Sequence, residues 1–216
     1  MTGAKERLAQ LLALAAERRW EALVHELSCL VRDWPGDYPQ SMRSPVLALF
    51  AWALRECDGE TRAAVATEMG GHPEVPLHLL NELYLAAPAP LRREILMRNQ
   101  LEREDDEPSV PADAASLLSA LRSGGRDFAA MLGSVCAIPH DIAQAILSDA
   151  SGEPLAVLCR GAALDRAVFS AVALLHAPQS LPLDVYDTVP EHAARRLTGQ
   201  WRSHHDAPPL QAAAAE

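Results

Sequence analysis

The chain has 216 residues, a length that suits one domain or two small ones and that is enough to bury a hydrophobic core. Alanine and leucine account for 71 of these residues, whereas valine and isoleucine together account for 16, and this balance excludes a mostly β fold. The formal net charge of −10 makes nucleic acid and anionic membranes poor partners, because both are themselves negatively charged.

The first sixty residues predict three amphipathic helices. An apolar residue recurs every three or four positions from Leu8 to Ala15, from Leu23 to Trp34 and from Val46 to Leu54, which is the spacing of one helix face. A loop is expected at 34–39. Ser44 and Pro45 are expected to be the N-cap and the first helical residue of the third helix.

The rest of the chain continues as short helices between glycine and proline residues. Asp58 is expected to cap a fourth helix that ends at Gly70, and helices near 75–86 and 89–103 complete an N-terminal helical part at 1–102. An acidic, proline-containing segment at 103–110 is the expected linker. Further helices are expected near 111–122, 126–136, 139–149, 154–162, 165–177 and 186–203, which together make a C-terminal part of helical hairpins at 111–203. The remaining residues, 204–216, are expected to form a mobile tail.

An internal repeat in the C-terminal part indicates stacked hairpins. The segment 128–146 aligns with 154–172 at an offset of 26 residues, and each copy has a helix, a tight break after Ala-Ile or Ala-Leu, and a second apolar stripe. Because a helix pair of this size cannot bury its stripe by itself, the copies are expected to stack, with Val168, Phe169 and Val172 facing inward. The predicted fold is all-α, with stacked helical hairpins in a HEAT-like α-solenoid or an irregular helical array, and a helical bundle is the alternative.

The sharpest functional motif is the hairpin at 154–177, which has the spacing of a DNA-binding helix-turn-helix. The second helix of such a motif presents polar and cationic groups to the DNA, but here it is apolar from Val168 onward and Arg166 is its only cation. A packed hairpin is therefore favoured, and a DNA-associated regulator is kept as the alternative function.

No set of residues predicts catalysis, a metal site or a cofactor. His25 and Cys29 have the helical spacing of two zinc ligands, but a structural zinc site needs four ligands. The four cysteines, Cys29, Cys57, Cys136 and Cys159, lie far apart in apolar patterns and are expected to be reduced and buried. No nucleophile can be matched to a base and an orienting group, so the chain is expected not to be an enzyme, with an uncatalogued enzyme as a further alternative.

Four residues are candidates for contact with a partner: Trp52, Arg92, Arg93 and Arg98. Trp52 lies off the apolar stripe that contains Phe50 and is expected to be exposed, and exposed tryptophans are frequent contact residues in interfaces. The arginines share one helix but, at 100° per residue, do not form a single stripe. A solvated face paired with nearby glutamates is therefore the alternative to a partner-binding patch.

Two stretches resemble a known bacterial family. They read LHLLNELYLAAPAPLRREILMRN at 77–99 and GEPLAVLCRGAALDRAVF at 152–169. Both are similar to the alphaproteobacterial domain of unknown function 2336 (DUF2336) family, and the similarity spans roughly residues 75–177. The resemblance implies an all-helical, HEAT-like protein of the bacterial cytoplasm, and it implies no activity, cofactor or site residue.

These observations predict a non-catalytic helical-repeat module for protein–protein interaction or regulation in a bacterial cytoplasm. The N-terminus lacks the uninterrupted apolar core of a signal peptide, and no window reaches the length of a membrane span. We therefore expect a cytoplasmic location and no membrane partner. Another protein is the expected partner through an exposed helix face or groove, nucleic acid is disfavoured, and a homo-oligomer is left open.

Overall fold

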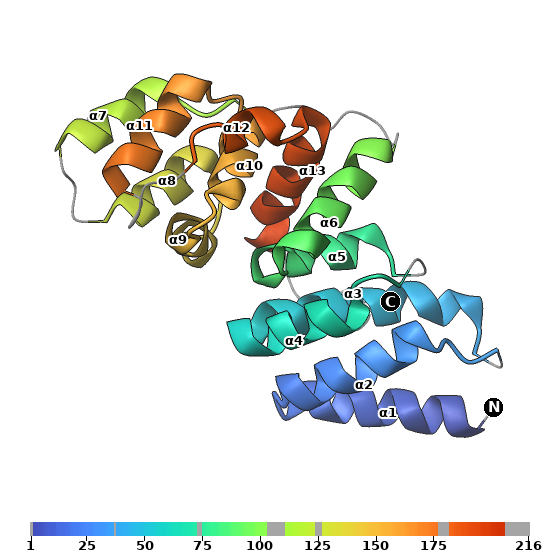
Figure 1. Cartoon of the computed structure of the whole chain (residues 1–216). Coiled ribbons are helices and arrows are strands. Elements are labelled where there is room, and N and C mark those ends of the chain that lie inside the picture. Colours follow the sequence, from blue (N-terminus) through green and yellow to red (C-terminus); the bar gives the residue numbers. More distant parts are fainter. Residues whose placement is uncertain are drawn as a thin grey trace. The chain divides into compact units, whose positions relative to one another are not determined.

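The computed structural model describes residues 2–36, 38–72, 75–102, 111–123, 127–176 and 182–205 (Figure 1). These residues form thirteen α-helices, three short 3-10 helices and no strand, which confirms the predicted all-α helical array. The chain divides into two compact units between Ile95 and Leu96, inside helix α6 (Ala89–Leu101). The predicted linker at 103–110, and the predicted tail apart from its first two residues, lie outside the described residues.

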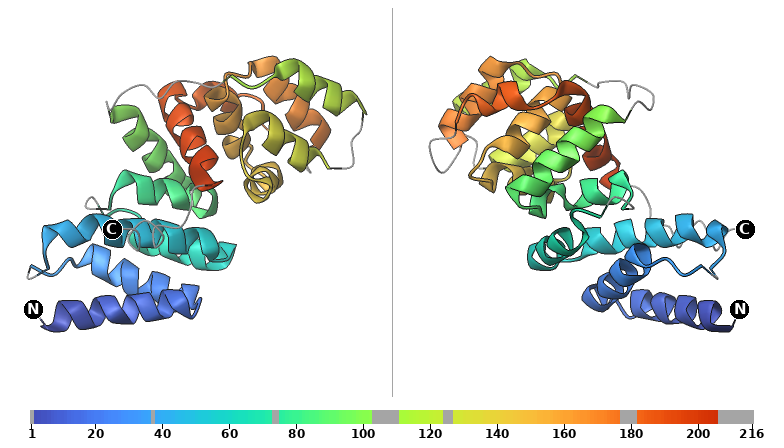
Figure 2. Two further views of the ribbon diagram at one scale, coloured as in Figure 1. Left: turned by 180° about the vertical axis from the view of Figure 1, so that it is seen from behind. Right: turned by 45° about the vertical axis from the view of Figure 1, so that its right-hand side comes forward.

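The first unit is a succession of packed helices. It contains α1 (Thr2–Ala16), α2 (Trp20–Arg32), η1 (Gln40–Met42), α3 (Arg43–Glu56), α4 (Gly59–Met69), α5 (Leu77–Leu83), η2 (Tyr84–Ala86) and the start of α6. Helix α1 packs on α2, α2 packs on both α3 and α4, and these two pack on α5. Figure 2 shows this order as successive layers, coloured from dark blue to teal. Large side chains that are fully buried fill the spaces between them: Leu23, Leu27, Phe50, Leu54, Met69 and Leu80.

The second unit is arranged around one central helix. It contains the rest of α6, then α7 (Ala114–Ser123), α8 (Phe128–Cys136), α9 (His140–Ser148), α10 (Glu153–Gly161), α11 (Arg166–His176), α12 (Val185–Thr188), α13 (Glu191–Arg202) and η3 (Ser203–His205). Helix α10 packs against α9, α11, α12 and α13, and seven of its nine residues are buried. Val168, Phe169 and Val172 of α11 are buried, as the stacking prediction requires.

Three hairpin turns share one backbone geometry. The turns after α1, α8 and α10 each contain a residue with a positive φ: Arg18 at 55°, Ala137 at 57° and Ala163 at 54°. In each turn the next amide donates a hydrogen bond to a carbonyl five residues earlier: Arg19 to Leu14 at 2.9 Å, Ile138 to Gly133 at 2.9 Å, and Leu164 to Cys159 at 2.8 Å. This is the left-handed ending that satisfies the last carbonyls of a helix. The turns at Ala137 and Ala163 are separated by the same 26 residues as the two aligned segments.

Two predicted helix boundaries are wrong, and both involve proline. Ser44 is not an N-cap, because η1 runs directly into α3 and the N-cap of α3 is Met42. Pro45 lies in the first turn of α3, where its missing amide costs no helical hydrogen bond. The helix predicted at 186–203 is two helices, α12 and α13. Pro190 separates them, since it lacks an amide and keeps Val189 extended.

The described helices were compared with the requirements of a membrane span. No single helix among them has both the length and the hydropathy to cross a membrane. Helices α8 and α9 meet the requirement only as a pair, and the chain bends by 116° between them.

Candidate functional site

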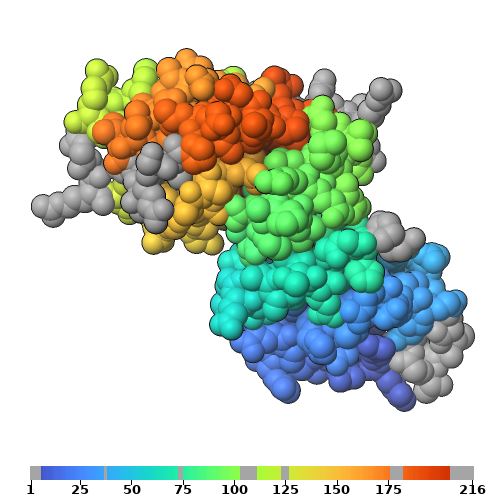
Figure 3. Space-filling view, in the orientation of Figure 1, coloured from blue at the N-terminus to red at the C-terminus, as the bar shows by residue number. Residues whose placement is uncertain are grey.

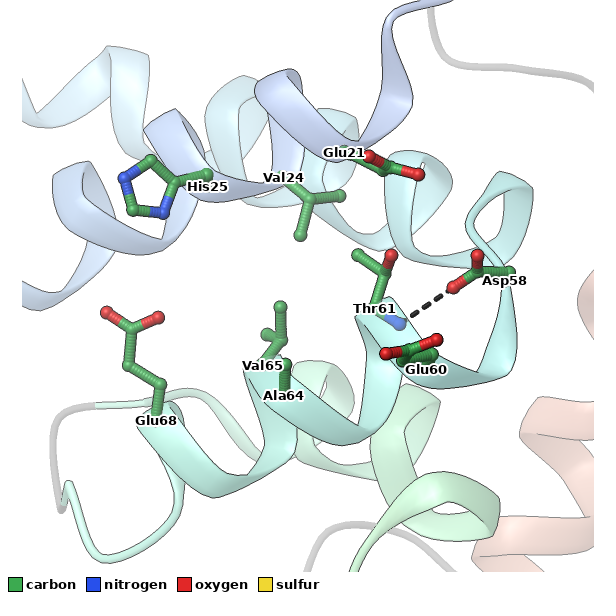
Figure 4. Close-up of a pocket in the computed structure, with 9 residues that line it drawn as sticks. All are labelled: Glu21, Val24, His25, Asp58, Glu60, Thr61, Ala64, Val65 and Glu68. Carbon is green, nitrogen blue, oxygen red and sulfur yellow. Dashed lines mark hydrogen bonds between the residues drawn. The ribbon is translucent and has the colours of Figure 1, made fainter.

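A groove of about 440 Å³ lies between α2 and α4 in the first unit (Figure 4). We call it the α2–α4 groove, and its lining residues are Glu21, Val24, His25, Asp58, Glu60, Thr61, Ala64, Val65 and Glu68. Val24 and Val65 point toward each other from the two helices, and both are buried. The floor of the groove is therefore apolar and its rim is mostly acidic.

The chemistry of helix starts places three carboxylates at one end of the groove. Asp58 is the N-cap of α4, as predicted, and its Oδ1 accepts a hydrogen bond from the Thr61 amide at 2.7 Å. That bond is the main reason why the pKa of Asp58 lies below its ordinary value. Glu21 and Glu60 lie in the first turns of α2 and α4, where the helix dipole favours negative charge.

An ion pair joins the two helices at the other end of the groove. Arg32 Nη1 on α2 lies 2.6 Å from Glu68 Oε1 on α4, and this bond raises the pKa of Arg32 above its ordinary value. His25 faces the same carboxylate across the groove in Figure 4. In the part of the chain that the structure describes, Glu21 and Glu60 form no ion pair. One end of the groove thus has a neutralised carboxylate, and the other has two exposed glutamates without a paired cation.

A second hollow of about 340 Å³ adjoins the groove. We call it the Trp20 hollow; it shares Glu21 and Asp58 with the groove and is otherwise lined by Arg18, Arg19, Trp20, Ala22, Glu56 and Cys57. The half-buried ring of Trp20 meets the ring of Trp52 edge to face, with centroids 4.7 Å apart and an interplanar angle of 79°. Because the two hollows share residues, we treat them as one continuous docking surface.

The lining side chains of the docking surface include one thiol, that of Cys57. Burial raises the pKa of the Cys57 thiol to about 11, so this group stays protonated near neutral pH and is a weak nucleophile. Apart from Trp20, the alanines and the valines, the other lining residues are acids, arginines, one histidine and one threonine. Within the described residues, no three His, Cys, Asp or Glu side chains are grouped closely enough to hold a metal ion.

The four contact residues predicted from the sequence lie outside the two hollows. Trp52 is half-buried rather than exposed, and its ring packs edge to face on that of Trp20. Arg92 is buried: its Nε and Nη2 donate to the carbonyls of Tyr84 and Leu85 at 3.1 and 3.0 Å, and its guanidinium lies 5.7 Å from the centre of the Tyr84 ring. This arginine therefore holds the end of η2 in place. On α6, Arg93 is exposed and Arg98 is half-buried.

Sequence patterns give little sign of the docking surface. They identify Asp58 as a helix cap, but they assign no role to Glu21 or Glu60. The docking surface combines residues 18–25 with residues 56–68, and no periodic pattern links two segments that meet only after folding. The one available signal is the coincidence of acids at two predicted helix starts.

The hairpin with helix-turn-helix spacing is held from outside by α12. The Tyr186 hydroxyl donates to the Leu164 carbonyl in the hairpin turn at 2.8 Å, and Arg160 Nη1 donates to the Tyr186 carbonyl at 3.2 Å. Arg166, the cation of α11, pairs with Asp187 at 3.1 Å. Figure 3 shows the α11 and α12 segments, orange to red, adjoining on the surface of the second unit. The cation that would contact DNA is thus already paired with a carboxylate.

Comparisons with known proteins identify a family for part of the second unit. Residues 111–198 match the model of a family described as an uncharacterised protein conserved in bacteria (DUF2336). The match includes the resembling stretch at 152–169, whereas the stretch at 77–99 and the docking surface lie outside it. The comparisons with curated proteins and with solved structures found no match. The match confirms the resemblance to this uncharacterised bacterial family for residues 111–198.

Proposed function

We propose that the chain is a non-catalytic protein-binding module of the bacterial cytoplasm, and that another protein binds at the docking surface. The observation that carries the proposal is the continuity of the α2–α4 groove and the Trp20 hollow. Together they offer an apolar floor, a charged rim and a half-buried tryptophan, which are the components of a protein interface.

The arrangement of the helices supports the same function. Packed helix pairs in the manner of HEAT-like repeats present a broad, semi-rigid surface, so a partner can bind without a large cost for ordering a loop. Both helices that line the groove are also fixed to each other by the Arg32–Glu68 pair. The groove is therefore formed before a partner arrives.

A substitution that fills the groove tests the proposal. Ala64 lines the groove and is exposed, so Ala64→Trp should block the groove without disturbing the core. Ala9→Trp, at an exposed position on α1 outside both hollows, is the matched control. We expect a protein partner that co-purifies at stoichiometric yield with the wild type and with Ala9→Trp, and at a yield reduced by about tenfold or more with Ala64→Trp.

Two results would overturn the proposal. The first is a partner recovered equally with the wild type and with Ala64→Trp, which would place the interface elsewhere. The second is the absence of any stoichiometric partner together with turnover in a broad hydrolase screen, which would favour an enzyme.

A further inference from the structure

We propose that the bound segment of the partner presents an arginine side chain to the docking surface, where the two hollows meet. Its guanidinium would lie beside Trp20 and between Glu21 and Glu60. This inference rests on the proposed function, and it adds the chemistry of the partner.

The charge of the docking surface is complementary to that of an arginine. Glu21 on α2 and Glu60 on α4 are exposed, approach the groove from opposite sides and, among the described residues, have no cation in an ion pair. Asp58, which lines both hollows, stays ionised because its pKa is lowered by the bond from Thr61. A cationic side chain placed among these groups would relieve the repulsion between like charges.

The opposite end of the groove already contains such an arrangement. There the guanidinium of Arg32 reaches from α2 to the carboxylate of Glu68 on α4 at 2.6 Å. At the end formed by Glu21 and Glu60, carboxylates are present on both helices, and among the described residues no arginine forms an ion pair with either of them, although Arg18 and Arg19 line the adjoining hollow. A guanidinium from a partner would make the equivalent bridge.

The spacing and the aromatic ring favour arginine over a metal ion or a lysine. Among the described residues, the acids of the docking surface do not form a group of three that could hold a metal ion. Trp20 lines the hollow beside Glu21, and its ring is held edge to face by Trp52. A planar guanidinium can stack on an indole and bond two carboxylates at once, which an ammonium cannot do.

The remaining lining residues define the neighbours of this arginine. Ala64, which is exposed, offers apolar surface to the aliphatic part of a side chain above the buried Val24 and Val65. Arg18 and Arg19, which directly precede Trp20 in the chain, also line the Trp20 hollow and would repel a second cation there. The preferred segment therefore has one arginine with uncharged neighbours, and a run of arginines should not bind more tightly.

A titration with short peptides tests the inference on the full chain. The probe is a capped heptapeptide with one central arginine among alanines, and its counterparts carry citrulline or lysine at the centre. The indole N–H signal of Trp20, assigned with a Trp20→Phe variant, reports binding by NMR. We expect this signal to shift with the arginine peptide, with an affinity about tenfold weaker for the citrulline peptide, which has the same shape but no charge.

Charge-matched variants locate the binding group. Glu21→Gln should weaken the arginine peptide by about tenfold, whereas Glu6→Gln, which removes one exposed acid from α1, should leave its affinity unchanged. An unshifted Trp20 signal at millimolar arginine peptide, or equal binding of the citrulline peptide, would overturn the inference. If Ala64→Trp still abolished partner recovery in that case, the docking function would stand with a different partner chemistry. If the peptide bound but Ala64→Trp kept its partner, the docking function would fail instead.

Discussion

At the scale of single residues, Gly161 sets how closely α10 and α13 approach. A Cβ at this position would collide with the Thr198 side chain and lie 2.5 Å from the Ala194 carbonyl oxygen. We therefore expect Gly161→Ala to reduce the free energy of unfolding by about 2–3 kcal/mol, even though alanine favours a helix. Gly59→Ala is the control, since no atom lies within 4 Å of its added Cβ. Urea unfolding followed by circular dichroism measures both, and equal stabilities would contradict the close packing.

The cysteines provide a second prediction at this scale. Cys57, Cys136 and Cys159 are buried, whereas Cys29 is only half-buried. Burial raises the pKa of the Cys57 and Cys136 thiols to about 11 and raises that of Cys159 as well. At pH 8 a disulfide reagent such as DTNB should therefore modify Cys29 rapidly and the other three only after unfolding. Rapid reaction of two or more thiols in the native protein would contradict this expectation.

At the scale of elements, replacing alanine by glycine should stabilise the left-handed turns although it destabilises a helix. Ala137 and Ala163 are exposed and have positive φ values, which an alanine adopts less readily than a glycine. Ala137→Gly and Ala163→Gly should each increase the free energy of unfolding by about 0.5–1 kcal/mol. The same change at Ala145, exposed in the middle of α9, should decrease it by about 1 kcal/mol. A loss of stability in all three variants would mean that the turns are not strained by alanine.

These turns also show what the sequence could and could not predict. The offset of 26 residues located both turns, because the apolar stripes on either side change direction at the same place in each copy. Helix α12 was not predicted as a separate helix, because Pro190 is the only sequence signal between it and α13. A proline is also common in the first turn of a longer helix, so Pro190 alone does not indicate a break. Local patterns fix the period of a helix, but the position of its first residue depends on contacts that form later.

The α10–α11 hairpin has a testable consequence of its own. Arg166 is bound to Asp187, and the buried residues of α11 include Val168 and Phe169. We therefore expect no retardation of duplex DNA by the full chain even at low salt, where the attraction between cations and phosphates is strongest. Retardation that disappears in an Arg166→Gln variant and is kept in Arg93→Gln would instead support a DNA-associated regulator.

At the scale of the whole molecule, the net charge of each half of the sequence does not indicate where the acidic docking surface lies. Residues 101–216 carry a net charge of −8 and residues 1–100 only −2, yet the acids of the docking surface belong to the less charged part. Folding produces this result because α2 and α4 begin on the same side of the first unit, each with acids in its first turn. A local field can thus be strongly negative in a segment that is nearly neutral on average.

Aspartates at the starts of α4 and α7 couple the stability of the molecule to pH. Hydrogen bonds hold the pKa of Asp58 and of Asp113 below the ordinary value, the former through Thr61 and the latter through Ser116. The folded state therefore takes up these protons less readily than the unfolded chain does. Their contribution to stability is complete above about pH 4, the ordinary pKa of an aspartate, and is lost as the pH falls through the lower pKa of the folded state.

A double variant, Asp58→Asn with Asp113→Asn, isolates this contribution because asparagine keeps a capping oxygen but not the charge. We expect its Tm to lie below that of the wild type at pH 6, by a gap that stays constant down to about pH 5 and narrows as the pH falls through the lowered pKa values of the two aspartates. The control is Glu6→Gln with Asp184→Asn, which removes the same charge from an exposed site and from an N-cap that makes no side-chain hydrogen bond. Its Tm at pH 6 should be equal to that of the wild type or higher, because the net charge becomes less negative than −10. A gap that widens toward acid pH would show that the two aspartates destabilise the folded state when ionised.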